Sequence, residues 1–92
     1  MSKPFYWNEL NTYDFAHLSP EKTIAILPLA STEQHGPHLP VATDVAIANG
    51  MLDELKIQRP DDLDILVLPT QEIGKANAHV YGPGSLSSGP EI

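Results

Sequence analysis

Two short apolar runs, separated by one amphipathic segment, set the hydrophobic pattern of this chain. Residues 23–29 (Thr-Ile-Ala-Ile-Leu-Pro-Leu) and residues 64–69 (Asp-Ile-Leu-Val-Leu-Pro) are almost unbroken apolar stretches of strand length. Such continuous runs are typical of strands that are buried on both faces of a parallel sheet. Each run is therefore predicted to be a buried strand.

The segment between the runs, residues 45–55, has helical spacing. Its apolar positions fall on one helical face, and polar side chains occupy the other. The apolar positions are Ile47, Ala48, Met51, Leu52 and Leu55. Asp44 directly precedes the segment and is the predicted N-cap, because its carboxylate can accept amides of the first turn. Gly50 lies inside the helix, where glycine costs about 1 kcal/mol relative to alanine, so a close packing contact is expected there.

Strand, helix and strand with short connections predict a parallel, right-handed βαβ unit and hence an α/β fold. A lead-in over residues 1–22, with a short helix within residues 8–18, precedes this unit, and a stretch rich in glycine and proline follows Pro69. Two strands and one helix leave sheet edges and one sheet face uncovered. The chain is therefore expected to be the opening third or so of a larger domain, cut short at its C-terminal end.

Composition excludes several classes of protein. The formal net charge is −7 with only five Lys and Arg, whereas nucleic-acid binding depends on clustered cations. There is no cysteine, so a metal would have to be held by histidine and carboxylate. No signal-peptide pattern begins the chain, and no apolar run reaches membrane-spanning length. A cytoplasmic protein without nucleic-acid or membrane partners is expected.

The candidate chemistry follows the first predicted strand, where ligands bind in open α/β sheets. In an extended segment the side chains of Glu33 and His35 point the same way, His38 arrives after a Gly-Pro turn, and Asp44 lies at the helix start. Two carboxylates and an imidazole suit Zn²⁺ or Mn²⁺. A bridging carboxylate can also hold two metals about 3.5–4 Å apart.

Spacing alone leaves ordinary roles open for each of these residues. Glu33 can be a solvated surface glutamate, His35 and His38 hydrogen-bonded loop histidines, and Asp44 simply a cap. His17, in the lead-in, is expected to be structural or exposed. His79 follows the second predicted strand and can line the same crevice.

A specific resemblance adds to this interpretation. Residues 27–40 (Leu-Pro-Leu-Ala-Ser-Thr-Glu-Gln-His-Gly-Pro-His-Leu-Pro), with Thr-Asp at residues 43–44, closely resemble the creatininase (creatinine amidohydrolase) family, and residues 74–87 resemble a second family segment. The resemblance implies an α/β/α sandwich, usually a homohexamer, that hydrolyses small cyclic or linear amides with Zn²⁺, Mn²⁺ or a mixed pair. It also implies that Glu33 ligates one metal, His35 the other, and Asp44 bridges them.

Departures from the family pattern narrow these expectations. Ala30 replaces a usual Gly and Ser85 a usual Thr, which are mild changes. Ala78 stands where a Glu commonly precedes the histidine, which argues against creatinine itself as the substrate. The family takes a further His and Glu ligand from an Asn-Gly-His-type segment that these 92 residues do not contain. With three of five ligands, the chain alone is expected to be inactive.

The leading hypothesis is that residues 1–92 are the N-terminal part of a single creatininase-like domain. Glu33, His35 and Asp44 are its predicted metal ligands, and His38 and His79 are catalytic candidates that line or orient the pocket. One alternative is a non-catalytic α/β module that binds a metal weakly or a partner subunit. Another keeps the family but changes the substrate to a formamide or a peptide amide in cofactor biosynthesis.

Overall fold

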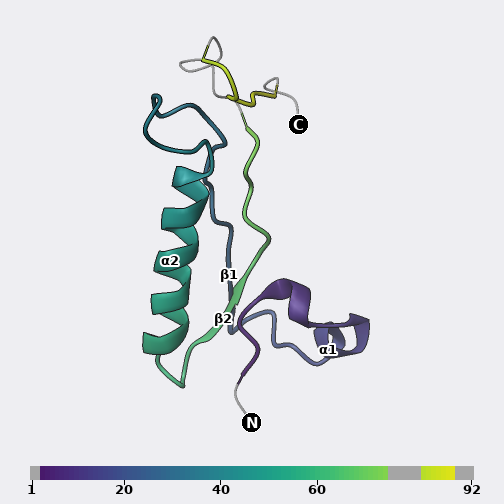
Figure 1. The fold of residues 1–92 in the computed structure, drawn as a ribbon. Coiled ribbons are helices and arrows are strands. Elements are labelled where there is room, and N and C mark those ends of the chain that lie inside the picture. Colours follow the sequence, from purple (N-terminus) through teal and green to yellow (C-terminus); the bar gives the residue numbers. More distant parts are fainter. Residues whose placement is uncertain (1–2, 75–81, 89–92) are drawn as a thin grey trace.

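A computed structural model describes residues 3–74 and 82–88, and the fold they form is a small α/β unit (Figure 1). After a 3-10 turn at Trp7–Glu9 come helix α1 (Thr12–Ala16), strand β1 (Thr23–Ile26), helix α2 (Thr43–Gln58) and strand β2 (Asp64–Val67). β1 and β2 pair in parallel, with Ile24 opposite Ile65. The long helix α2 connects the two strands and runs beside them. The predicted α/β class and parallel strand pairing are confirmed.

Both strands are shorter than the apolar runs predicted. β1 ends at Ile26 and β2 at Val67, and a proline follows each strand two residues later, Pro28 and Pro69. Proline has no amide hydrogen and interrupts a regular ladder. Pairing resumes beyond the prolines as a parallel bridge between Leu29 and Gln71. The chain after β1 therefore stays beside the chain after β2.

The core lies between β2, the N-terminal segment and α2. Its buried cluster consists of Phe5, Leu52, Ile65 and Val67. The amide of Val67 donates to the carbonyl of Phe5 at 2.8 Å, so the N-terminal segment pairs with one side of β2. β1 pairs with the other side of β2. Central placement buries β2 as predicted.

β1 is not buried on both faces, and that prediction is wrong. Ile24 is 45 % exposed and Ala25 is exposed as well. Within residues 3–74 and 82–88, β1 pairs with β2 alone, which makes it an edge strand. An apolar run shows that its residues can be buried. Whether they are buried depends on which other segments pack against the strand.

Helix α2 contacts the core with a narrower face than predicted. Leu52 is buried and Leu55 half-buried, whereas Ile47 and Met51 are 59 % and 70 % exposed. The helix also begins two residues earlier than expected, at Thr43, and its N-cap is Ala42. The prediction that Asp44 caps the helix is therefore wrong. Asp44 lies inside the first turn, where a negative charge still interacts favourably with the helix dipole.

The expected close contact at Gly50 is not observed. A Cβ atom added to Gly50 would meet nothing within 4 Å, so the glycine carries its conformational cost without a packing reason among the described residues. Gly50→Ala is therefore expected to raise the free energy of unfolding by about 0.5–1 kcal/mol. Urea unfolding followed by circular dichroism measures this change.

Gly36→Ala is the matched control, because Gly36 has a φ of +77° that favours glycine. This substitution is expected to lower the free energy of unfolding by about 1–2 kcal/mol. A loss of stability in Gly50→Ala would contradict the open surroundings of Gly50.

The short helix predicted within residues 8–18 is α1, at Thr12–Ala16, and a separate 3-10 turn at Trp7–Glu9 precedes it. The break between them occurs at Asn11, whose side chain accepts from the amide of Asp14 at 3.0 Å while the Asp14 carboxylate accepts from the amide of Asn11 at 2.9 Å. This reciprocal capping box starts α1 at Thr12. Among the described residues, no helix has the length and apolarity needed to cross a membrane.

Candidate metal centre

The loop between β1 and α2 carries the candidate site, and backbone hydrogen bonds hold its first half in an extended form. The amide of Ala30 donates to the carbonyl of Gln71 at 3.0 Å, and the amide of Thr32 donates to the carbonyl of Glu72 at 2.8 Å. Alternate side chains of an extended chain share a direction. Glu33 and His35, two positions apart, follow directly from this paired stretch.

Glu33, His35 and Asp44 come together at the start of α2. Each offers one ligand atom, and these atoms all lie within 4.8 Å of one another. His35 Nε2 is 3.2 Å from Asp44 Oδ1. All three residues are half-buried. The first turn of α2 thus brings a carboxylate back to the loop that precedes it.

The donor set fits a divalent metal. His35 Nε2 is buried and has no hydrogen-bond partner among the described residues, although a carboxylate oxygen lies beside it. A buried polar atom without a partner is costly and calls for an explanation. An imidazole nitrogen and carboxylate oxygens around one point form a ligand set suited to Zn²⁺ or Mn²⁺. A cation there would satisfy the unpartnered nitrogen.

Comparison with known families agrees with this chemistry. The creatininase family, described as creatinine amidohydrolase, matches residues 8–92. The chain belongs to the creatininase family. Enzymes of the creatininase family depend on metals, and the Glu33–His35–Asp44 group is a possible place for one in this member.

Curated creatininase-family relatives carry the name mycofactocin precursor peptide peptidase. The protein from Mycolicibacterium smegmatis is 40 % identical over 68 residues, which cover 72 % of this chain and 28 % of that protein. The protein from Mycobacterium tuberculosis is 34 % identical over 89 residues, which cover 90 % of this chain and 36 % of that protein. The chain thus spans about a third of the length of these relatives. No solved structure gives a significant match.

The remaining histidines have different surroundings. His38 is exposed and is not part of the group formed by Glu33, His35 and Asp44. Its ring lies beside Gly36, 3.5 Å from where a Cβ on that residue would be. His79 lies outside the described residues. His17 is exposed, and its Nδ1 is 2.7 Å from the carbonyl oxygen of Tyr13.

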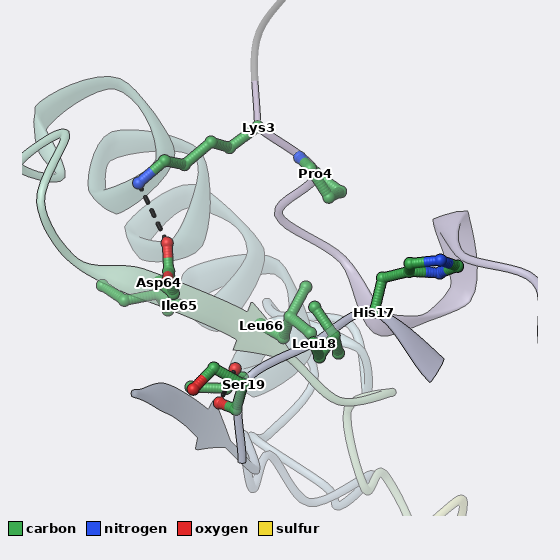
Figure 2. A pocket seen from close by; sticks show the side chains of 9 residues that line it. Lys3, Pro4, His17, Leu18, Ser19, Asp64, Ile65 and Leu66 are labelled. Atoms are coloured by element: carbon green, nitrogen blue, oxygen red, sulfur yellow. Dashed lines mark hydrogen bonds and ion pairs between the residues drawn. The ribbon is translucent and has the colours of Figure 1, made fainter. Parts of the chain in front are cut away.

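His17 also borders a hollow of about 250 Å³ at the end of the sheet where the two strands begin (Figure 2). The hollow is lined by Thr23 and Asp64, the first residues of β1 and β2. Figure 2 shows the ion pair of Lys3 with Asp64, at 2.9 Å, at this end. Glu33, His35 and Asp44 lie beyond the C-terminal ends of the strands, so His17 is not part of that group.

Sequence reasoning missed a contact between the candidate loop and residues 82–88. The amide of Gln34 donates to Ser85 Oγ at 2.9 Å, across a separation of 51 residues. The amide of Leu86 donates to the carbonyl of Thr32, also at 2.9 Å. Spacing along the chain carries no signal for this contact. The order of the strands and the resemblance of both segments to one family indicated only that the two segments share a crevice.

Proposed function

We propose that this chain forms part of the active site of a metal-dependent amidohydrolase. The convergence of Glu33, His35 and Asp44, with ligand atoms within 4.8 Å of one another, is the observation that supports this function most directly. A divalent metal bound to such a set acidifies water and polarises an amide carbonyl, which together promote hydrolysis. Membership of the creatininase family supports the same reaction class.

Each residue has a distinct part in the proposed site. In the 92-residue chain the three side chains would hold one metal ion. In a subunit of family length, as the family resemblance implies, Glu33 and His35 would each ligate one metal, and Asp44, which has two carboxylate oxygens, would bridge the pair. The position of Asp44 in the first turn of α2 gives its carboxylate a rigid base, and its proximity to His35 Nε2, 3.2 Å, is compatible with ligands converging on a cation. His38 and His79 would line the pocket, where they would orient the substrate or transfer a proton during hydrolysis.

The proposed substrate is a peptide amide. Two considerations favour it over creatinine. The relatives above are named as peptidases of a precursor peptide, and this chain has Ala78 before His79, where the family resemblance leads us to expect a glutamate. A subunit of family length that carries these residues is expected to release amines from peptide amides and to leave creatinine intact. Turnover of creatinine at a comparable rate would contradict this choice.

Titration with Zn²⁺ and with Mn²⁺ tests the metal site in the 92-residue chain itself. Calorimetry is expected to show saturable binding, and nuclear magnetic resonance is expected to show that Zn²⁺ shifts the ring signals of His35 more than those of His17. The physical reason is that His35 Nε2 is buried and unpartnered among the described residues, whereas His17 already contacts a backbone carbonyl. Binding that leaves the His35 signals unchanged would contradict the site, and no binding would favour a non-catalytic module.

A further inference from the structure

We propose that residues 82–88 position the metal ligands through Gln34, the residue between Glu33 and His35. Ser85 and Gly82 are the two residues of this segment that make the contact, one with the backbone and one with the side chain of Gln34. The inference rests on the proposed metal site and adds to it a positioning device from another part of the chain.

The backbone contact extends the pairing that holds the loop. At alternate residues, the amides of Ala30 and Thr32 donate to backbone carbonyls, and the amide of Gln34 donates to Ser85 Oγ at 2.9 Å. A side-chain hydroxyl thus stands in for the next carbonyl of the ladder. The Gln34 amide belongs to the peptide bond that joins it to Glu33. Fixing this peptide restricts the directions in which the Glu33 side chain can point from the backbone.

The side chain of Gln34 acts on the other side of His35. Its Oε1 accepts from the amide of Gly36 at 2.9 Å, and Gly36 has a φ of +77°, which turns the chain. The hydrogen bond spans His35, so it restrains the backbone on which the imidazole stands. Groups that orient metal ligands in this way typically change metal affinity 10–100-fold when they are removed.

Gly82 provides the surface against which Gln34 packs. A Cβ on Gly82 would lie 2.2 Å from Cγ of Gln34 and 3.0 Å from its Cβ, well inside contact distance. A side chain at position 82 would therefore displace Gln34, together with its bond to Gly36. Gln34 can therefore occupy its position only because residue 82 is a glycine.

The segment has anchors of its own. The amide of Leu86 donates to the carbonyl of Thr32 at 2.9 Å, and the amide of Ser88 donates to the carbonyl of Gly74 at 2.8 Å. Loss of the Ser85 hydroxyl would therefore remove one restraint on Gln34 while the segment stays attached to the loop. This makes Ser85→Ala a specific probe of positioning.

Metal titrations of Ser85→Ala, Ser85→Thr and Gly82→Ala test the proposal in the full 92-residue chain. Ser85→Ala and Gly82→Ala are expected to lower Zn²⁺ affinity by about 10-fold or more. Ser85→Thr keeps the hydroxyl, which the family resemblance also expects at this position, and should remain within about 3-fold of the unaltered chain. With Co²⁺ as a spectroscopic probe, the visible absorption bands should change in Ser85→Ala and return in Ser85→Thr.

Ser88→Ala is the control, because Ser88 Oγ is buried without a hydrogen-bond partner among the described residues. Its affinity and Co²⁺ spectrum should match those of the unaltered chain. The positioning role is overturned if Ser85→Ala binds and absorbs like the unaltered chain, or if Ser85→Thr fails to restore what Ser85→Ala loses. An unaltered chain that binds no metal would instead overturn the metal site, and the positioning role with it.

Discussion

His35→Ala and Asp44→Asn are each expected to lower the Zn²⁺ affinity of the chain by more than about 100-fold, beyond the cost of losing a residue that only supports a ligand. The three ligand atoms lie within 4.8 Å of one another, and zinc in proteins generally takes at least three protein ligands. Removing one leaves two donors and an incompletely coordinated ion. Calorimetric titration of each variant measures the loss.

Glu72→Gln is the control for these ligand variants. Glu72 is an exposed carboxylate beside the same loop, and its contact with the loop is through its backbone carbonyl, which accepts from the amide of Thr32. Its substitution removes the same charge that Asp44→Asn removes and is expected to change Zn²⁺ affinity less than about 3-fold, since an exposed charge is well screened. Equal losses in Glu72→Gln and Asp44→Asn would show that net charge, and not the ligand group, attracts the metal.

Phe5→Ala is expected to remove most of the stability of the fold. Phe5 is fully buried, belongs to the same cluster as Leu52 and Val67, and meets the ring of Tyr6 edge-on at 5.0 Å. Truncation of a buried phenylalanine costs about 3–5 kcal/mol. Domains have only about 0.05–0.15 kcal/mol of stability per residue, so this loss approaches the total for a small one. Urea unfolding should show a much lower midpoint or no cooperative transition.

Tyr13→Ala is the matched control for the loss of an aromatic ring. Tyr13 is 80 % exposed on α1, and its removal should change the free energy of unfolding by less than about 0.5 kcal/mol. A small effect of Phe5→Ala, comparable with that of Tyr13→Ala, would contradict the position of Phe5 at the centre of the core. The comparison separates burial from aromatic character.

The elements that depend on local pattern were predicted well. The apolar runs at residues 23–29 and 64–69 contain β1 and β2, and the helical spacing over residues 45–55 lies within α2. The grouping of Glu33 with His35 likewise follows from a local rule, because alternate residues of an extended chain face one way. The sequence also carried the family motif, which is why the membership could be predicted from residues 27–44.

Predictions that depended on surroundings the residue type does not specify were wrong. Gly50 was expected to pack closely and has open space, and β1 was expected to be buried and is an edge strand. Asp44 has the residue type of an N-cap, but the helix begins before it. In each case the residue type was compatible with two surroundings.

The sequence by itself determined the βαβ order, the loop that carries Glu33 and His35, and the creatininase family, because periodicity, residue type and motif depend on neighbouring positions. Only the tertiary structure decided that Asp44 faces His35 from the first turn of α2 and that Ser85 holds Gln34 from 51 residues away. The first contact arises because the chain turns back between His35 and the start of α2, and the second because parallel pairing brings the segments after β1 and β2 to the same end of the sheet. The strand–helix–strand pattern predicts the parallel pairing, but it does not say which side chains the pairing brings together.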